Sequence, residues 1–204
     1  ATGVSFRHQS LFDFVYARAM VAEELSLVEQ VLQHQGLFIR RRVWSVLSYL
    51  REQSREQYLR ELSCLWHAPK LRQHLKRLML DFIGQVIGPS PEEVGMMRQS
   101  LRNSTWQVPA LVAAARGRGW FPLLRDRELP DAMVNPRVAS ICVDILVDAS
   151  GEDTDAVLGL MERFWLADVD GAHRVALVLS RRTVWNEHAL HIAQRAVVML
   201  PLTL

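Results

Sequence analysis

The stretches LFIRRRVWSVLSYL (37–50) and SREQYLRELSCLWH (54–67) decide the fold class of this chain. In both, apolar residues recur every three or four positions, the spacing that places them on one face of an α-helix. Only a few polar residues separate the two stretches. We therefore expect two antiparallel helices joined by a short turn.

The same helical spacing runs outward from this pair in both directions. Toward the N-terminus it predicts one long helix, which starts at Ser10 and Asp13 in a capping-box-like arrangement and stops at Gly36. Toward the C-terminus, further helices are expected at about 69–87, 91–102, 109–117 (or 109–119), 137–150, 153–167, 172–182 and 184–200.

Two segments fit the helical pattern less well. Residues 120–136 contain three prolines, which predicts short helical turns at a change of direction. The run ICVDILVDA (141–149) is rich in β-branched residues and can be interpreted as a strand, although its length and its place between helices favour a helix.

Together these segments predict an all-α fold of about ten to eleven helices. A train of helical hairpins joined by short polar turns is typical of an α/α superhelix, here a HEAT-like solenoid. No exact repeated motif is present in the sequence, so any repeat is degenerate. A compact helical bundle is the alternative.

Composition limits the functional classes. Of the 204 residues, 50% are hydrophobic, which is enough for a substantial core, and the formal net charge of +2 is not that of a polybasic protein. Cys64 and Cys142 are expected to be buried free thiols in a reducing compartment. The sequence contains no uncharged apolar run of about 18 residues, so we expect a cytoplasmic protein without a membrane segment.

Motifs for catalysis or metal binding are weak. Residues 117–119 (GRG) lack the length and the Lys-Ser/Thr ending of a phosphate-binding loop. Cys64 and His67 lie one helical turn apart and can form a nucleophile pair, but a core thiol beside a histidine at a helix end is the simpler interpretation. His188 and His191 offer two metal ligands without an evident third. We expect no enzymatic activity and no metal in this chain.

Two basic clusters are candidates for binding. The first is Arg40-Arg41-Arg42, and the second is the predicted helix that carries Lys70, Arg72, His74, Lys76 and Arg77. The possible basic binding face consists of Lys70, Arg72, Lys76 and Arg77. It can contact the phosphates of a nucleic acid, or it can bind an acidic partner. The alternative is an ordinary solvated outer face.

The beginning of the chain resembles a known motif. Its pattern is Phe6-x-His8-x-Ser10-Leu11-x-Asp13-Phe14-x-x-Ala17. This is similar to the pattern that closes the winged-helix domain of STAND-class NTPases, the group that includes NOD-like receptors and their bacterial relatives. The match departs from that pattern at Leu11, where an aromatic residue is usual, and at Tyr16, where alanine is common.

The resemblance implies a place within a larger protein. Residues 1–10 would be the tail end of an upstream winged-helix-like module, and 11–204 a HEAT-like helical repeat domain. In the intact parent protein His8 would reach the phosphates of ADP, so ATP or ADP would be the parent's cofactor, with none in this chain. The aromatic residues after His8 would anchor the winged helix to the following helical region.

The implied function is non-catalytic. The chain would be the scaffold or sensor region of a STAND-like signalling or defence NTPase, binding a ligand or protein partner and relaying that contact to the upstream nucleotide-binding domain. The alternative is a stand-alone α-solenoid adaptor that binds protein or, less favoured, nucleic acid through its Arg/Lys-rich face.

Overall fold

The computed structural model describes residues 9–22, 26–135 and 137–166. This part of the chain contains eleven α-helices and no strand, so the all-α prediction is confirmed. The predicted helices at 172–182 and 184–200 lie outside the described residues, as do His8, His188 and His191. The solenoid arrangement stays a prediction.

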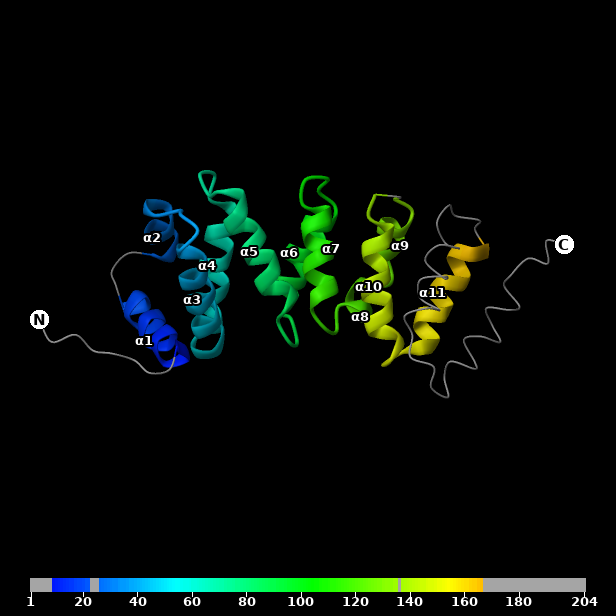
Figure 1. The fold of residues 1–204 in the computed structure, drawn as a ribbon, viewed down its shortest axis with the longest axis horizontal. Helices are drawn as coiled ribbons and strands as arrows, with labels where there is room; N and C mark the ends of the chain where they lie inside the picture. Colours follow the sequence, from blue (N-terminus) through cyan, green and yellow to red (C-terminus); the bar gives the residue numbers. More distant parts are fainter. Residues whose placement is uncertain (1–8, 23–25, 136, 167–204) are drawn as a thin grey trace, which may run out of the picture. The chain divides into compact units, whose positions relative to one another are not determined.

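The chain divides into two compact units, residues 1–82 and 83–204. No glycine- or serine-rich linker marks this division, which falls inside a helix, and the predicted domain boundary after residue 10 stays a prediction. The first unit contains α1 (Gln9–Ala22), α2 (Leu27–Gln33), α3 (Ile39–Gln53), α4 (Arg55–His67) and most of α5 (Gln73–Gly84) (Figure 1). The second contains the end of α5 together with α6 (Pro91–Leu101), α7 (Gln107–Arg116), α8 (Phe121–Leu124), α9 (Glu128–Met133), α10 (Ala139–Ser150) and α11 (Thr154–Leu166).

In the first unit α3 is the central helix and packs against α1, α2 and α4. Its buried residues are spaced by three and four, as predicted, and are Ile39, Val43, Val46, Leu47 and Leu50. The ring of Phe82 packs between two aromatic neighbours, with ring centroids 5.1 Å from Trp44 and 6.1 Å from Tyr58. Ser54 alone connects α3 to α4 and caps α4 by accepting a hydrogen bond from the Gln57 N–H.

In the second unit α10 packs against α7, α8, α9 and α11. Trp120 is fully buried, and its indole Nε1 donates a hydrogen bond to the carbonyl oxygen of Gly84 at 2.8 Å. The buried carboxylate of Glu128 pairs with Arg102 at 3.2 Å and with Arg98 at 3.6 Å. A buried indole donor and a buried carboxylate thus both have partners.

The prediction of one long helix from Ser10 to Gly36 is wrong. The structure has α1 and α2 in its place, and because α1 begins at Gln9, Ser10 is not its N-cap. Ser26 caps α2 in a reciprocal capping box with Glu29. The buried side chain of Glu61 in α4 accepts a further hydrogen bond from the Leu27 N–H at 3.2 Å. The new helix begins directly after Ser26. The carboxylates of Glu29 and Glu61 and the hydroxyl of Ser26 accept hydrogen bonds from the backbone N–H groups at its start.

Of three other predicted elements, two agree with the structure and one differs at its start. Residues 139–150 form a helix and not a strand, and residues 121–133 form the short helices α8 and α9, as expected from the prolines. The predicted start at Pro69 is wrong, because residues 68–72 form a turn and α5 begins at Gln73.

Candidate binding surface

Two turns of the first unit meet through Gln35. One turn joins α2 to α3 and the other joins α4 to α5. The Gln35 side chain donates to the carbonyl oxygen of Lys70 at 3.1 Å and accepts from the Arg72 N–H at 2.8 Å. The guanidinium of Arg72 returns a hydrogen bond to the Gln35 carbonyl oxygen at 3.3 Å. Three hydrogen bonds therefore hold the two turns together.

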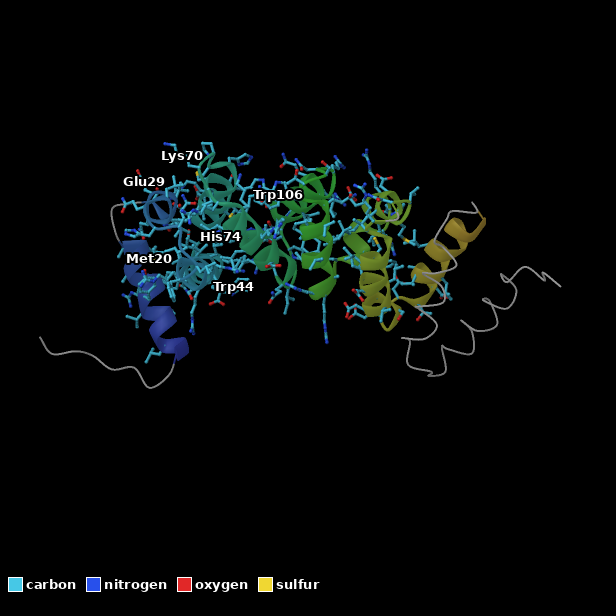
Figure 2. The ribbon with its side chains drawn as sticks, turned by 45° about the horizontal axis from the view of Figure 1, so that its top comes forward. Met20, Glu29, Trp44, Lys70, His74 and Trp106 are labelled. Atoms are coloured by element: carbon cyan, nitrogen blue, oxygen red, sulfur yellow. The ribbon has the colours of Figure 1, made fainter. Side chains whose placement is uncertain are left out.

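Cationic side chains gather around this junction. Lys70 and Arg72 are exposed in the turn before α5, and Arg40 is half-buried in the first turn of α3. Figure 2 labels Lys70 in that turn and His74 in the first turn of α5. We call Leu37, Phe38, Arg40, Lys70 and Arg72 the loop patch.

The loop patch also contains two exposed apolar side chains. Phe38 is 94% exposed and Leu37 is 70% exposed. Neighbouring exposed apolar side chains are typical of interaction sites, whereas a single exposed one is ordinary surface. Neither residue was predicted as a binding residue, because both fall inside the helix expected at 37–50. One signal was available: Phe38 lies four residues before exposed Arg42, outside the apolar face of α3.

The structure brings only part of the predicted basic face together. Lys70 and Arg72 lie in the loop patch, whereas the Lys76 ammonium lies 5.7 Å from the centroid of the Trp66 ring in α4. Such a contact engages the charge with the protein's own aromatic residue. Arg77 is exposed on α5. Arg40, from the other predicted cluster, completes the group that faces the two turns.

His74 is electrostatically coupled to two residues of the loop patch. Burial lowers the pKa of His74, and the charges of Arg40 and Arg72 lower it further. Its Nε2 is buried and has no hydrogen-bond partner in the described part of the chain. The imidazole is therefore neutral near pH 7, and the positive charge of the loop patch comes from its lysine and two arginines.

The two cysteines differ from one another. Cys142 is buried, as expected, and its burial raises the pKa of the thiol to about 12. The expectation of a buried Cys64 is wrong, because Cys64 lies on the exposed side of α4. The neighbouring His67 ring has its Nδ1 2.9 Å from the Ser63 carbonyl oxygen. This nitrogen is already engaged by the backbone of its own helix.

Two further observations concern the described residues as a whole. Within them, no group of three or more His, Cys, Asp or Glu side chains is arranged to hold a metal ion. None of the helices in the described ranges has the length and apolar character needed to cross a membrane.

The second unit has an open hollow of about 620 Å³ between α7 and α10, lined in part by Arg116, Asp144 and Asp148.

Comparison of the chain with protein-family models, with curated proteins and with solved structures finds no match in any of the three. The loop patch combines the two most exposed large apolar side chains of the described part of the first unit with the exposed cations Lys70 and Arg72.

Proposed function

We propose that this chain is a non-catalytic helical scaffold or sensor region of a larger STAND-like NTPase. In this proposal it binds a protein partner through the loop patch and relays the contact to the upstream nucleotide switch. The setting is cytoplasmic signalling or defence, as the resemblance of the opening motif implies.

The observation that carries the proposal is the position of α3 between the loop patch and α1. Arg40 in the first turn of α3 belongs to the loop patch. Arg42, two residues later, places its guanidinium carbon 4.8 Å from the centroid of the Tyr16 ring in α1. The Phe14 ring of α1 meets Tyr49 of α3 edge-on, with centroids 5.4 Å apart. Phe14 and Tyr16 follow His8 in the opening motif.

These contacts support a mechanical link. A partner that moves Arg40 acts on the same helical turn that contacts Tyr16, and α1 begins at Gln9, the residue after His8 in the sequence. Because protein interiors are close-packed, a displacement of α3 is transmitted to α1, which packs against it. In the intact parent His8 would respond by changing its contact with the nucleotide phosphates.

The native size of the polypeptide tests the proposal first. An antibody raised against this chain should detect, in source cells, a band much larger than 23.4 kDa. In that larger protein, His8→Ala should weaken ADP binding, whereas His34→Ala, an exposed histidine outside the motif, should not. A band at 23.4 kDa would rule out the STAND-like parent.

A second candidate is a stand-alone adaptor. The loop patch favours it, because this surface lies within the first unit and needs no nucleotide-binding module to form. The same immunoblot separates the two candidates, since an adaptor would run at its own mass. Partner binding through the loop patch is common to both.

A further inference from the structure

We infer that the loop patch docks an acidic protein segment that carries a large apolar side chain. The inference rests on the proposed function and names the class of partner. The segment's carboxylates would pair with Arg40, Lys70 and Arg72. Its apolar residue would cover Phe38 and Leu37.

Charge complementarity supports an acidic partner. Within the described residues, none of the three cations of the loop patch forms an ion pair with a carboxylate. Arg72 is instead oriented by the carbonyl oxygen of Gln35. A guanidinium held in this way loses less conformational freedom when it binds, which favours association. Carboxylates of a partner would supply the missing counter-charges.

The apolar residues favour a protein over other anionic partners. Protein interfaces are enriched in both aromatic residues and arginine, and the loop patch contains Phe38 together with Arg40 and Arg72. Single-stranded nucleic acid would stack a base on Phe38, but Leu37 beside it offers no stacking surface. Anionic membranes are usually recognised by clusters of about four to eight basic residues, more than the three cations of this patch.

Hydrogen bonds fix the backbone of the two turns of the patch before binding. Two side-chain hydrogen bonds of Gln35 and one from Arg72 connect the two turns, which carry four of the five residues, all except Arg40. The Gly36 and Leu37 carbonyl oxygens accept from the Ile39 and Arg40 N–H groups, which ties the apolar pair to the start of α3. A partner segment would therefore meet a surface that needs little reordering.

Selection from a displayed library of random peptides of about 12 residues tests the inference on the whole chain. We expect enriched peptides to be rich in Asp and Glu and to contain Phe, Trp or Leu. A synthetic copy of the best peptide, measured by fluorescence anisotropy, should bind Phe38→Ser about tenfold more weakly than the wild type, the loss typical of an interface anchor. The combined Arg40→Glu, Lys70→Glu and Arg72→Glu variant should show a similar or larger loss.

Matched controls separate these losses from general effects. Ile87→Ser removes an apolar side chain of similar exposure, and Arg118→Glu, Arg127→Glu and Arg137→Glu together change the net charge equally at exposed positions. Both controls should bind within about twofold of the wild type, because the changed residues do not belong to the loop patch. Circular dichroism should give the same helical content for all variants.

Several outcomes would overturn the inference. These are the absence of enriched peptides, enrichment of neutral or basic peptides, or equal losses in the control variants. Tighter patch-dependent binding of a single-stranded oligonucleotide of about 20 nucleotides, or of vesicles containing phosphatidylserine, would assign the patch to another partner. If the selection failed but the immunoblot showed a large native polypeptide, only the proposed docking site would be contradicted. If the immunoblot showed a band at 23.4 kDa, only the STAND-like parent would be contradicted.

Discussion

Gly84→Ala tests how the end of α5 packs against α7. A Cβ built on Gly84 would overlap the carbonyl oxygen of Ala113 and would lie 2.6 Å from its carbonyl carbon. Both are backbone atoms of a helix, so they have no rotamer by which to move away. The two helices would have to separate by about 1 Å at this point, and such overpacking typically costs about 1–3 kcal/mol.

The same movement would disturb the Trp120 hydrogen bond. Its Nε1 is buried and donates to the Gly84 carbonyl oxygen at 2.8 Å, and a buried donor that loses its acceptor costs about 1–3 kcal/mol. Alanine recovers up to about 1 kcal/mol through its higher helix propensity. The free energy of unfolding should therefore fall by about 3 kcal/mol, which corresponds to a drop of roughly 6–12 °C in Tm for a chain of this length.

Thermal unfolding followed by circular dichroism measures this effect against a matched control. Gly95→Ala makes the same chemical change in α6, where a Cβ at Gly95 would meet nothing within 4 Å. The control should keep or raise Tm, because only the helix propensity changes. If Gly84→Ala unfolded at the temperature of the control, the close approach of α5 and α7 would be refuted.

Three further changes test other contacts. Trp120→Phe should lower the unfolding free energy by about 1–3 kcal/mol, measured by urea unfolding, because the Gly84 carbonyl oxygen loses its buried donor. Glu61→Gln should weaken the cap on the Leu27 N–H and destabilise α2 by about 1 kcal/mol, seen as faster amide hydrogen exchange in α2; unchanged exchange would contradict the cap. Because burial raises the pKa of Cys142 from 9.0 to about 12 in the folded state, unfolding releases a proton in that range. The contribution of Cys142 to the free energy of unfolding should therefore be fully present below pH 9 and should be lost as the pH rises toward 12. In urea titrations at a series of pH values, Cys142→Ala should reduce this dependence on pH.

Local sequence signals accounted for most of the helices but not for all of their ends. The apolar spacing of α3 was predicted from the sequence, and the structure confirms it. Ser54, which was expected inside the helix 54–67, is instead the N-cap of α4. The break between α1 and α2 was also visible, since Ser26 and Glu29 have capping-box spacing. The prediction of one long helix rested on a continuous apolar face across that break and did not use the capping signal.

The candidate site was only partly predictable for a different reason. Lys70 and Arg72 were recognised from local charge, but their junction with the turn before α3 depends on Gln35, which is 35 residues before Lys70 in the chain. No local pattern specifies such a tertiary hydrogen bond. The same holds for Lys76, which lies one turn from Arg72 yet is positioned over Trp66 of another helix. Helical spacing predicts a shared face, whereas tertiary contacts decide which charges remain available.

The first turn of α3 brings the two halves of the proposed function together. The charge of Arg40 acts on His74 at the start of α5, and Arg42 packs on Tyr16 of α1. Successive residues of a helix project about 100° apart, so residues two positions apart point to different sides. One helical turn can therefore contact a partner on one side and the opening motif on the other. The neutral His74 beside Arg40 adds no charge of its own, so the cations of the loop patch alone set the attraction for an acidic partner.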